Sequence, residues 1–560
     1  MRRLTRTIHL VALLTLAAAS VIGAARSVPP VPADAFSPSN AQTEDGRFIR
    51  EADFLPAARC ASCHTDTHAG WSQSLHHNAG REPFYKESVD ILLRTRGVEF
   101  TRHCEACHAP VALLTGSLDR GHSPSKAMTD EGVTCLVCHS ITAARADGTG
   151  SYTIRRPALL ARPDGTLLPG EVADEQILAD IEGHRRAMMR PLLKQPEFCA
   201  SCHKSSAPPA LNGYKFIRGF SAYDEWQQSG ASRETVTPFY RRAQRADCRA
   251  CHMPQVTSHN DNSAKQGLIA SHRWLGANTA SPLFYGQVEQ VALTQNFLKA
   301  DVLAVDIFAV KGEARGACLQ TLVPDAENLA TFAPGEAVTA EVVVANRNAA
   351  HSFPPELRDL YEAWVEFEAL DASGQAIFHS GFLLSDGTLD ESAHVYRTIL
   401  LDESGRMITR HQVWLAAVKA YDNAIAAGRS DVIRFRFRLP ADQQAARAVT
   451  LRARVNYRRF NKEYTAYVLG RTGSQLTIPV VTMTQAEVVI VQSTMQAMQA
   501  RDARLAQPAP TSLAQARRWN DYGIGLLEQS CYADAAAAFQ QAAALNPKAP
   551  TYWSIKPSPR

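Results

Sequence analysis

The sequence predicts a multidomain protein, with a mostly helical and loop-rich N-terminal domain, an all-β sandwich of immunoglobulin-like type and a short C-terminal α-helical segment. Three observations lead to this fold class: Cys-x-x-Cys-His motifs clustered between residues 60 and 252, period-two alternation of apolar residues after Asp301, and helical periodicity from Trp519 to Pro547. The length of 560 residues agrees with about three domains.

Residues 1–25 have the pattern of a secretory signal peptide. A basic start, Met1-Arg2-Arg3, precedes an apolar run and small residues. We therefore expect a periplasmic or otherwise exported protein, with residues 26–50 as a flexible lead-in. An uncleaved membrane anchor is the alternative. No later segment reaches the ~20 apolar residues of a spanning helix, so no membrane span is expected after signal cleavage.

Residues 51–300 carry five motifs that attach c-type haem. In such a motif the two thiols form thioethers and the histidine binds iron as the proximal ligand. A single motif would also fit a zinc half-site or a thiol-exchange pair, but five with the same trailing histidine favour haem. We expect a pentahaem cytochrome c domain with five covalently bound haem c groups, at Cys60-Cys63-His64, Cys104-Cys107-His108, Cys135-Cys138-His139, Cys199-Cys202-His203 and Cys248-Cys251-His252.

Two cysteines lie outside these motifs, Cys318 and Cys531. They would pair with each other in an oxidising compartment, or remain isolated thiols. The formal net charge of +4 includes arginines of the signal peptide, so the mature chain is close to neutral. This balance gives no indication of a nucleic-acid partner.

Residues 301–490 are expected to form the β-sandwich. Apolar side chains alternate with arginines in 432–439 and 449–458, which is typical of half-buried antiparallel strands. Further strand candidates are 341–345, 363–370, 394–401 and 475–481. The arginine rows form either a docking face for an acidic partner or, more commonly, a solvated outer face.

Residues 491–560 contain helical periodicity. Trp519, Gly523, Ala535 and Phe539 resemble the spacing of a tetratricopeptide (TPR) repeat, in which small residues let two antiparallel helices pack closely. One repeat cannot bury both of its faces, so it must pack on the neighbouring domain or on a protein partner.

Around the haem motifs the chain resembles the family of multihaem cytochromes c that includes the tetrahaem electron acceptors of hydroxylamine oxidoreductase. The resemblance spans about residues 60–278. It is carried by Cys60-Ala61-Ser62-Cys63-His64 with the Trp-x-x-Ser-x-His tail ending at His76, by Glu131-Gly132-Val133-Thr134-Cys135, by Glu197-Phe198-Cys199-Ala200-Ser201-Cys202-His203, and by Cys251-His252-Met253-Pro254.

The resemblance implies that each iron is held by two histidines. His76, His184 and His272 stand at the positions that supply the distal imidazole in such proteins. The segment around His351 is similar to a His-x-Phe-Pro segment of some of these cytochromes, so His351 either reaches a haem or is an ordinary turn histidine. His122 is the fifth distal candidate, and His68 and His77 are close substitutes.

The leading hypothesis is an exported pentahaem cytochrome that relays electrons between a donor and an acceptor protein. Bis-histidine ligation favours electron transfer because it leaves no coordination site for a substrate. The alternative is a multihaem oxidoreductase that acts on a small nitrogen or sulfur oxyanion at one haem with an open distal site. No motif ends in lysine, which weakens a reductase of the Cys-x-x-Cys-Lys type. A haem-bearing sensor or scaffold is the third hypothesis.

Overall fold

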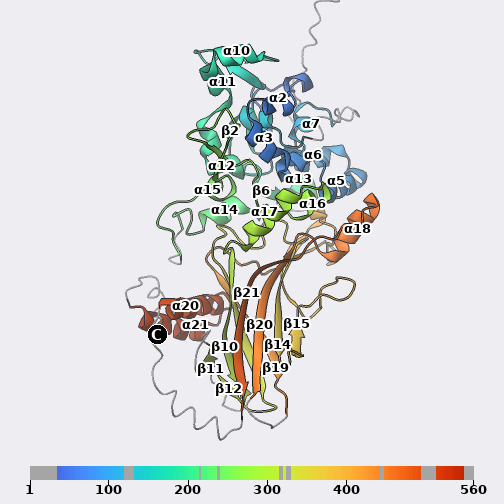
Figure 1. Cartoon of the computed structure of the whole chain (residues 1–560). Coiled ribbons are helices and arrows are strands. Elements are labelled where there is room, and N and C mark those ends of the chain that lie inside the picture. The colour runs from blue at the N-terminus through green and yellow to red at the C-terminus, as the bar shows by residue number, and fades with distance from the viewer. Residues whose placement is uncertain are drawn as a thin grey trace, which may run out of the picture.

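The computed structural model describes residues 35–118, 131–213, 216–235, 240–313, 319–322, 330–441, 447–493 and 513–547. It combines a helix-rich part, formed by the N-terminal half, with a part built from long strands (Figure 1). A pair of C-terminal helices lies against the strands. The chain is therefore multidomain and contains both helices and sheets.

The helix-rich part consists mostly of short helices. Its longest helix, α5 (Pro83–Arg96), begins with Pro83 and is capped by the Glu82 carboxylate, which accepts a hydrogen bond from Tyr85 N; it ends at Gly97, whose φ is 101°. The other helices are α2 (Ala58–Ala61), α3 (Thr65–Ser72), α4 (Leu75–Asn78), α6 (Val98–His108), α7 (Pro110–Leu114), α9 (Cys135–Ser140), α10 (Asp174–Ala179), α11 (Ile181–Met188), α12 (Pro196–Ala200), α13 (Pro209–Asn212), α14 (Ala222–Gln227), α15 (Cys248–His252), α16 (Ala280–Phe284) and α17 (Val288–Lys299).

Small sheets connect these helices. One has the order β1-β3-β2, and three are two-stranded: β4-β5, β6-β7 and β8-β9. Their bounds are β1 (Gln42–Thr43), β2 (Ile141–Ala144), β3 (Tyr152–Ile154), β4 (Ala158–Ala161), β5 (Leu167–Pro169), β6 (Lys204–Ala207), β7 (Ile217–Ser221), β8 (Gln255–Thr257) and β9 (Leu268–Ala270).

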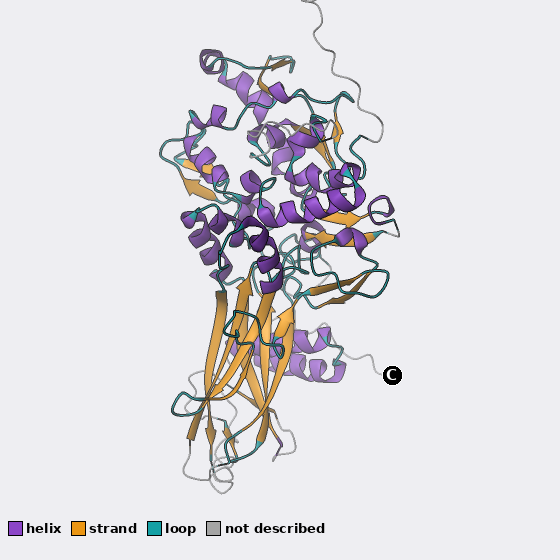
Figure 2. Cartoon of the chain, turned by 90° about the vertical axis from the view of Figure 1, so that its right-hand side faces the viewer, coloured by secondary structure: helices purple, strands orange, loops and turns teal. Residues whose placement is uncertain are grey.

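The strand part is formed by two larger sheets around one apolar core. The orders are β11-β10-β13-β19 and β12-β21-β20-β14-β15, with β16 paired to β14. Figure 2 shows the long strands of this part in orange. The core takes side chains from both sheets, such as Val342, Phe367 and Phe435. The bounds are β10 (Leu303–Gly312), β11 (Leu319–Thr321), β12 (Thr331–Phe332), β13 (Ala337–Asn346), β14 (Glu362–Leu370), β15 (Ala376–Ser380), β16 (His394–Tyr396), β19 (Ser430–Arg438), β20 (Arg447–Arg458) and β21 (Val481–Gln492).

Two strands follow the alternation of the sequence. In β19, Ile433, Phe435 and Phe437 are buried while the arginines between them are exposed. In β20 the apolar residues are buried as expected, but Arg452 and Arg454 are half-buried and Arg458 is buried. The strand expected at 475–481 is wrong for residues 475–480, which are coil after α18 (Lys462–Thr472); only Val481 lies in a strand, as the first residue of β21. The immunoglobulin-like classification stays a prediction.

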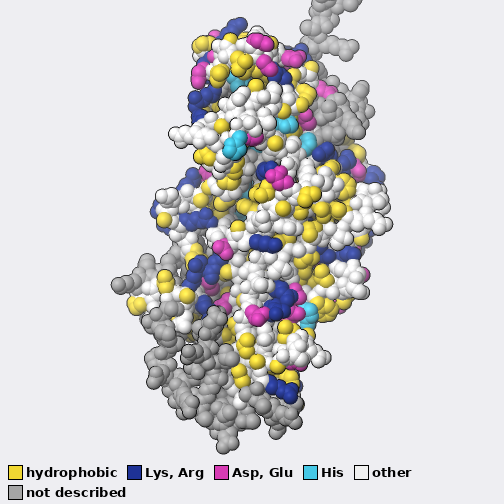
Figure 3. All heavy atoms as spheres, in the orientation of Figure 1, with side chains coloured by type: hydrophobic (Ala, Val, Ile, Leu, Met, Phe, Trp, Pro, Cys, Tyr) yellow, Lys and Arg dark blue, Asp and Glu magenta, His cyan; other side chains and the backbone are white. Residues whose placement is uncertain are grey.

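The arginine rows are paired with acidic residues of neighbouring strands. Arg454 contacts Glu366 at 2.8 Å and Glu368 at 2.7 Å, and Arg452 contacts Glu487 at 2.9 Å. Basic and acidic side chains accordingly lie side by side on this surface (Figure 3). Because these arginines already pair with carboxylates of neighbouring strands, the structure does not support a docking face for an acidic partner.

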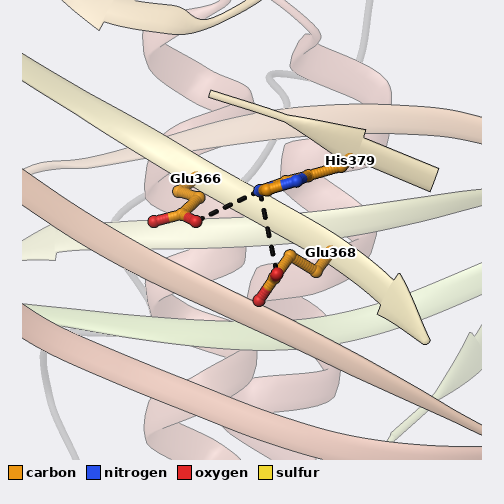
Figure 4. Close-up of side chains that lie close together, drawn as sticks. All are labelled: Glu366, Glu368 and His379. Carbon is orange, nitrogen blue, oxygen red and sulfur yellow. Dashed lines mark hydrogen bonds and ion pairs between the residues drawn. The ribbon is translucent and has the colours of Figure 1, made fainter. Parts of the chain in front are cut away.

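His379 joins the same network. Its Nε2 lies 3.1 Å from Glu366 and 3.7 Å from Glu368 (Figure 4). The trio has the residue types of a metal site, yet both carboxylates already bind Arg454. We interpret it as an ion-pair cluster.

The C-terminal helices α20 (Leu513–Glu528) and α21 (Tyr532–Leu545) pack on the β10-β13-β19 face. Tyr522, Ile524 and Phe539 form a cluster with Phe308 and other residues of these strands. The helices approach closely at Gly523, where a Cβ atom would stand 2.9 Å from the Phe539 ring. The hairpin thus buries one face on the neighbouring sheet. Its TPR-like classification stays a prediction.

Among the described helices, none has the length and hydropathy needed to cross a bilayer.

Candidate haem-binding cavity

A cavity of about 1870 Å³ runs through the helix-rich part and reaches the strand part. All ten cysteines and all five histidines of the Cys-x-x-Cys-His motifs line it. The strand part contributes further lining residues, among them His351, Glu356 and His411. The motifs, which are far apart in sequence, therefore open into one continuous space.

Each motif forms a helical turn. The first motif shows the local reason: His64 N donates to Cys60 O at 2.9 Å, and in the fourth motif His203 N donates to Cys199 O at 2.8 Å. This turn places the two cysteines, three residues apart, on the same side of the chain. Thr134 and Asp247 cap the turns of the third and fifth motifs through their side chains.

Every motif histidine is held through Nδ1, which orients the ring. The acceptors are Asp261 for His64 (3.3 Å), Ala79 O for His108 (3.2 Å), Met188 O for His139 (2.8 Å), Glu356 for His203 (2.7 Å) and Leu275 O for His252 (2.7 Å). With Nδ1 engaged, Nε2 is the nitrogen left to bind a metal, as is usual in haem and metal sites.

Three motif histidines face a second histidine across the cavity. The ring centroids of His64 and His184 are 6.3 Å apart, those of His203 and His76 6.0 Å, and those of His252 and His351 6.4 Å. Two metal–nitrogen bonds of about 2 Å, plus the distance from each nitrogen to its ring centre, total roughly 6 Å. One iron would therefore fit between the rings of each pair.

His272 is placed near the third motif. Its Nδ1 donates to Ala270 O at 2.9 Å. Burial lowers the pKa of His272 to about 4, and the largest effect of a neighbouring charge on it comes from His139. His272 is thus the candidate within electrostatic range of His139. The fifth distal candidate, His122, lies outside the described residues.

The two alternative distal candidates, His68 and His77, pack against a tryptophan. The rings of His68 and His77 pack against Trp71, at 5.5 Å and 4.4 Å. His77 also contacts Arg81 through Nε2 at 3.1 Å. Neither faces a motif histidine within ring contact among the described residues.

Burial keeps most of these imidazoles neutral, which a metal ligand requires. It lowers the pKa of His76 to about 3 and the pKa values of His108 and His252 to about 4. His203 is different: burial acts against its protonation, but the Glu356 carboxylate outweighs burial and raises the pKa of His203 to about 9. A carboxylate acceptor at Nδ1 makes the imidazole a stronger electron donor.

The connection after β13 brings the strand part into the cavity. It supplies His351, Glu356 and Asp359, and it is fastened by Glu225, which accepts from Ser352 N at 2.9 Å and from Arg358 at 2.5 Å. Sequence reasoning identified His351 here but missed Glu356, because nothing in the sequence places it beside a motif 153 residues away.

His411 is a second residue that sequence reasoning missed. It precedes the short 3-10 helix η4 (Val413–Leu415) and lines the cavity, and its Nδ1 lies 2.8 Å from Asp359 Oδ2. No motif or spacing distinguishes it in the sequence.

The thiols show which motifs are neighbours in space. Cys60 interacts directly with Cys135, Cys107 with Cys202, and Cys199 with Cys248. Cys138 of the third motif also lies within electrostatic range of Cys202. The first motif is therefore next to the third, and the third lies near the fourth. The second and fifth motifs are both next to the fourth.

The expected pairing of Cys318 with Cys531 stays a prediction. Cys531 is a free thiol, and Cys318 lies outside the described residues.

The family model "Cytochrome c554 and c-prime" matches residues 59–140 and 198–270. This match supports a multihaem cytochrome c family for that part of the chain and implies covalently bound haem c. No curated protein matches the chain.

Two solved structures show some likeness. A penta-heme cytochrome c552 from Thermochromatium tepidum is 16% identical, with 78% of this chain and 100% of that chain covered and a TM-score of 0.47. Spo0M, a sporulation control protein from Bacillus subtilis, is 8% identical, with 36% and 56% covered and a TM-score of 0.13. At such scores neither likeness defines the fold.

Proposed function

We propose that this chain is an exported pentahaem c-type cytochrome that relays electrons between redox proteins. The observation that carries the proposal is the single cavity lined by all five motifs, in which motif histidines face second histidines at about the separation that one iron requires. Bound haem would supply the one-electron redox centre.

The residues fit haem by their chemistry as well as by their number. Each motif offers two thiols for thioether bonds and one oriented imidazole. His184, His76, His272 and His351 are the proposed distal ligands opposite His64, His203, His139 and His252. Two imidazole ligands suit electron transfer because the coordination geometry changes little on reduction.

The arrangement of the attachment points supports a relay. The fourth motif contacts the second and fifth motifs through its thiols and lies close to the third. Electrons entering near the first motif would thus pass the third to reach the fourth, where the path divides. Chain order alone would have placed the second motif between the first and the third.

Export and partner binding complete the proposal. The N-terminal signal pattern fits haem attachment outside the cytoplasm. Donor and acceptor would be redox proteins, and the TPR-like helices α20 and α21 keep one exposed face that includes Tyr532, which would contact one of them.

Mass spectrometry of the mature protein tests the proposal. We expect a chain cleaved near residue 25 and carrying five haem groups, with a ferric EPR spectrum dominated by low-spin signals. A secreted chain with fewer haems, or one without haem, would refute it. The matched control is Cys531→Ser, which removes a thiol outside the motifs and should leave the haem content unchanged.

A further inference from the structure

One proposed distal histidine, His76, is held differently from the other three. Their Nδ1 atoms donate to backbone carbonyls: His184 to Leu159 O at 2.7 Å, His272 to Ala270 O at 2.9 Å and His351 to Ser352 O at 3.0 Å. The Nδ1 of His76 is buried and has no hydrogen-bond partner within the described part of the chain. A hydrogen bond at the second ring nitrogen is the usual means of fixing the plane of a ligating imidazole. The plane of the His76 ring is therefore fixed by another kind of contact.

Trp274 supplies that contact. Its indole ring and the His76 ring form a T-shaped pair, with centroids 4.4 Å apart and planes at 72°. The same indole meets the His272 ring in the same manner, at 4.9 Å and 78°. T-shaped pairs of this kind are attractive, so they hold the two rings in a defined relative orientation. One indole ring thus touches the proposed distal ligands of two haems, those of the fourth and third motifs.

The backbone holds Trp274 in place from both sides. Its φ is 41°, a left-handed conformation that costs energy for a bulky residue and persists only where the surroundings hold it. On one side, Arg273 donates to Glu289 at 2.8 Å and to Gln290 at 3.1 Å, both in α17, and Arg273 O accepts from Gln290 at 3.1 Å. On the other side, Leu275 O accepts from His252 Nδ1 at 2.7 Å. The indole is therefore presented from a fixed loop.

The same anchor reaches the segment that carries His76. Arg273 Nη1 donates to Gln73 Oε1 at 3.3 Å, and Gln73 Nε2 donates to Glu289 at 3.1 Å. Gln73 lies between α3 and α4, and α4 contains His76. Trp274 and His76 are thus attached to one set of polar contacts, which fixes where the indole stands relative to the imidazole.

We propose that Trp274 is a positioning residue that sets the plane of the His76 imidazole and joins the distal ligands of the haems at the third and fourth motifs. This role rests on the proposed ligation of iron by His76 and His272. Trp274 itself binds no iron, because the indole nitrogen is only a hydrogen-bond donor. Its effect on His272 is the smaller one, since the Nδ1 of His272 keeps its bond to Ala270 O.

EPR spectroscopy of the ferric protein measures the plane of an axial imidazole. The g values of a low-spin ferric haem depend on the angle between the planes of its two imidazole ligands. His76→Ala first identifies the signal to follow: we expect one low-spin haem to become high-spin, with five haems still attached by mass spectrometry. The low-spin signal that disappears belongs to the haem of the fourth motif.

Trp274→Leu tests the inference on that signal. Leucine keeps an apolar side chain at the position but removes the flat ring, so the His76 imidazole loses its partner and keeps its bond to iron. We expect the identified signal to stay low-spin with shifted g values, while five haems remain attached and the other low-spin signals keep theirs.

Trp274→Phe is the matched variant, because phenylalanine retains a flat ring. Its g values should lie close to those of the unchanged protein. Trp519→Ala is the control for loss of a tryptophan elsewhere: Trp519 packs on Phe308 at 4.9 Å in the C-terminal hairpin, and its removal should leave every signal unchanged. If Trp274→Leu does not acquire five haems, Trp274→Ala replaces it with the same expectation.

Two results would overturn the inference while leaving the electron relay intact. One is an unchanged spectrum of Trp274→Leu. The other is an equal shift in Trp274→Leu and Trp274→Phe, since the flat ring would then not set the His76 plane. A His76→Ala protein that keeps all of its low-spin signals would instead refute the proposed ligation, and a chain without haem would refute the proposed function itself.

Discussion

His351 of the strand part faces His252 of the fifth motif, with ring centroids 6.4 Å apart and ring planes 14° apart. The two residues are 99 positions apart in the sequence. His351 follows β13, whose pairing with β10 and β19 fixes where the connection enters the cavity. The strand part therefore helps to build the cavity and is not only attached beside it.

Removing His351 should expose one iron. In His351→Ala we expect one low-spin haem to become high-spin while five haems stay attached, because the thioether cysteines are untouched. EPR spectra and mass spectrometry measure both quantities. His77→Ala is the control, since His77 packs on Trp71 instead of facing a motif histidine. An unchanged spectrum of His351→Ala would contradict the proposed ligation.

Glu356 should tune the haem of the fourth motif. Its carboxylate accepts from His203 Nδ1 at 2.7 Å, which strengthens the imidazole as a donor and stabilises the ferric state. In Glu356→Gln the reduction potential of one haem should rise, by ~59 mV if the relative ligand affinity of the two oxidation states changes tenfold. A redox titration followed by absorption measures it. Glu366→Gln, in the surface ion-pair cluster, should leave all potentials unchanged.

Glu82 should make stability depend on pH. Burial raises its pKa to about 7 in the folded state, against an ordinary value of 4.5. An unfolded chain releases this proton near pH 4.5 while the folded chain retains it, so the contribution of Glu82 to the free energy of unfolding falls as pH rises from 4.5 to 7. The full effect of 2.5 pH units is about 3 kcal/mol.

Denaturant unfolding between pH 4.5 and 7 tests this expectation. Glu82→Gln should lose less stability over that interval because glutamine does not ionise, and it retains an oxygen to accept from Tyr85 N. Glu182→Gln, on the exposed face of α11, is the control and should follow the unchanged protein. If the free energy of unfolding changed with pH by the same amount in Glu82→Gln and in the unchanged protein, Glu82 would not titrate as described.

The contact between α20 and α21 should be sensitive to one methyl group. In Gly523→Ala the new Cβ would stand 2.9 Å from the Phe539 ring, which cannot move freely because it is buried. We expect the hairpin to lose about 1–3 kcal/mol of stability. Gly470→Ala in α18, which has no atom within 4 Å of the added Cβ, should instead stabilise its helix by roughly 0.5–1 kcal/mol. Limited proteolysis around residues 513–547 reports on the hairpin.

The strands β19 and β20 and the five haem-attachment motifs could be predicted from the sequence, because each depends on residues within a short window. The distal candidates His76, His184, His272 and His351 came from a family resemblance, and their placement near motif histidines is a tertiary property. Glu356 and His411 could not be found from sequence, since a glutamate and a histidine in a loop carry no signal until the fold brings them to His203 and Asp359.

The connection tied to Glu225 also imposes an order on maturation. Translation produces residues 60–252 before His351 and His411. A nascent chain would thus acquire its cofactors while some irons still lack their final neighbours. Only when the strands have closed does the cavity acquire its last wall, so a truncated or misfolded C-terminal half would leave a chemically reactive, incomplete cytochrome.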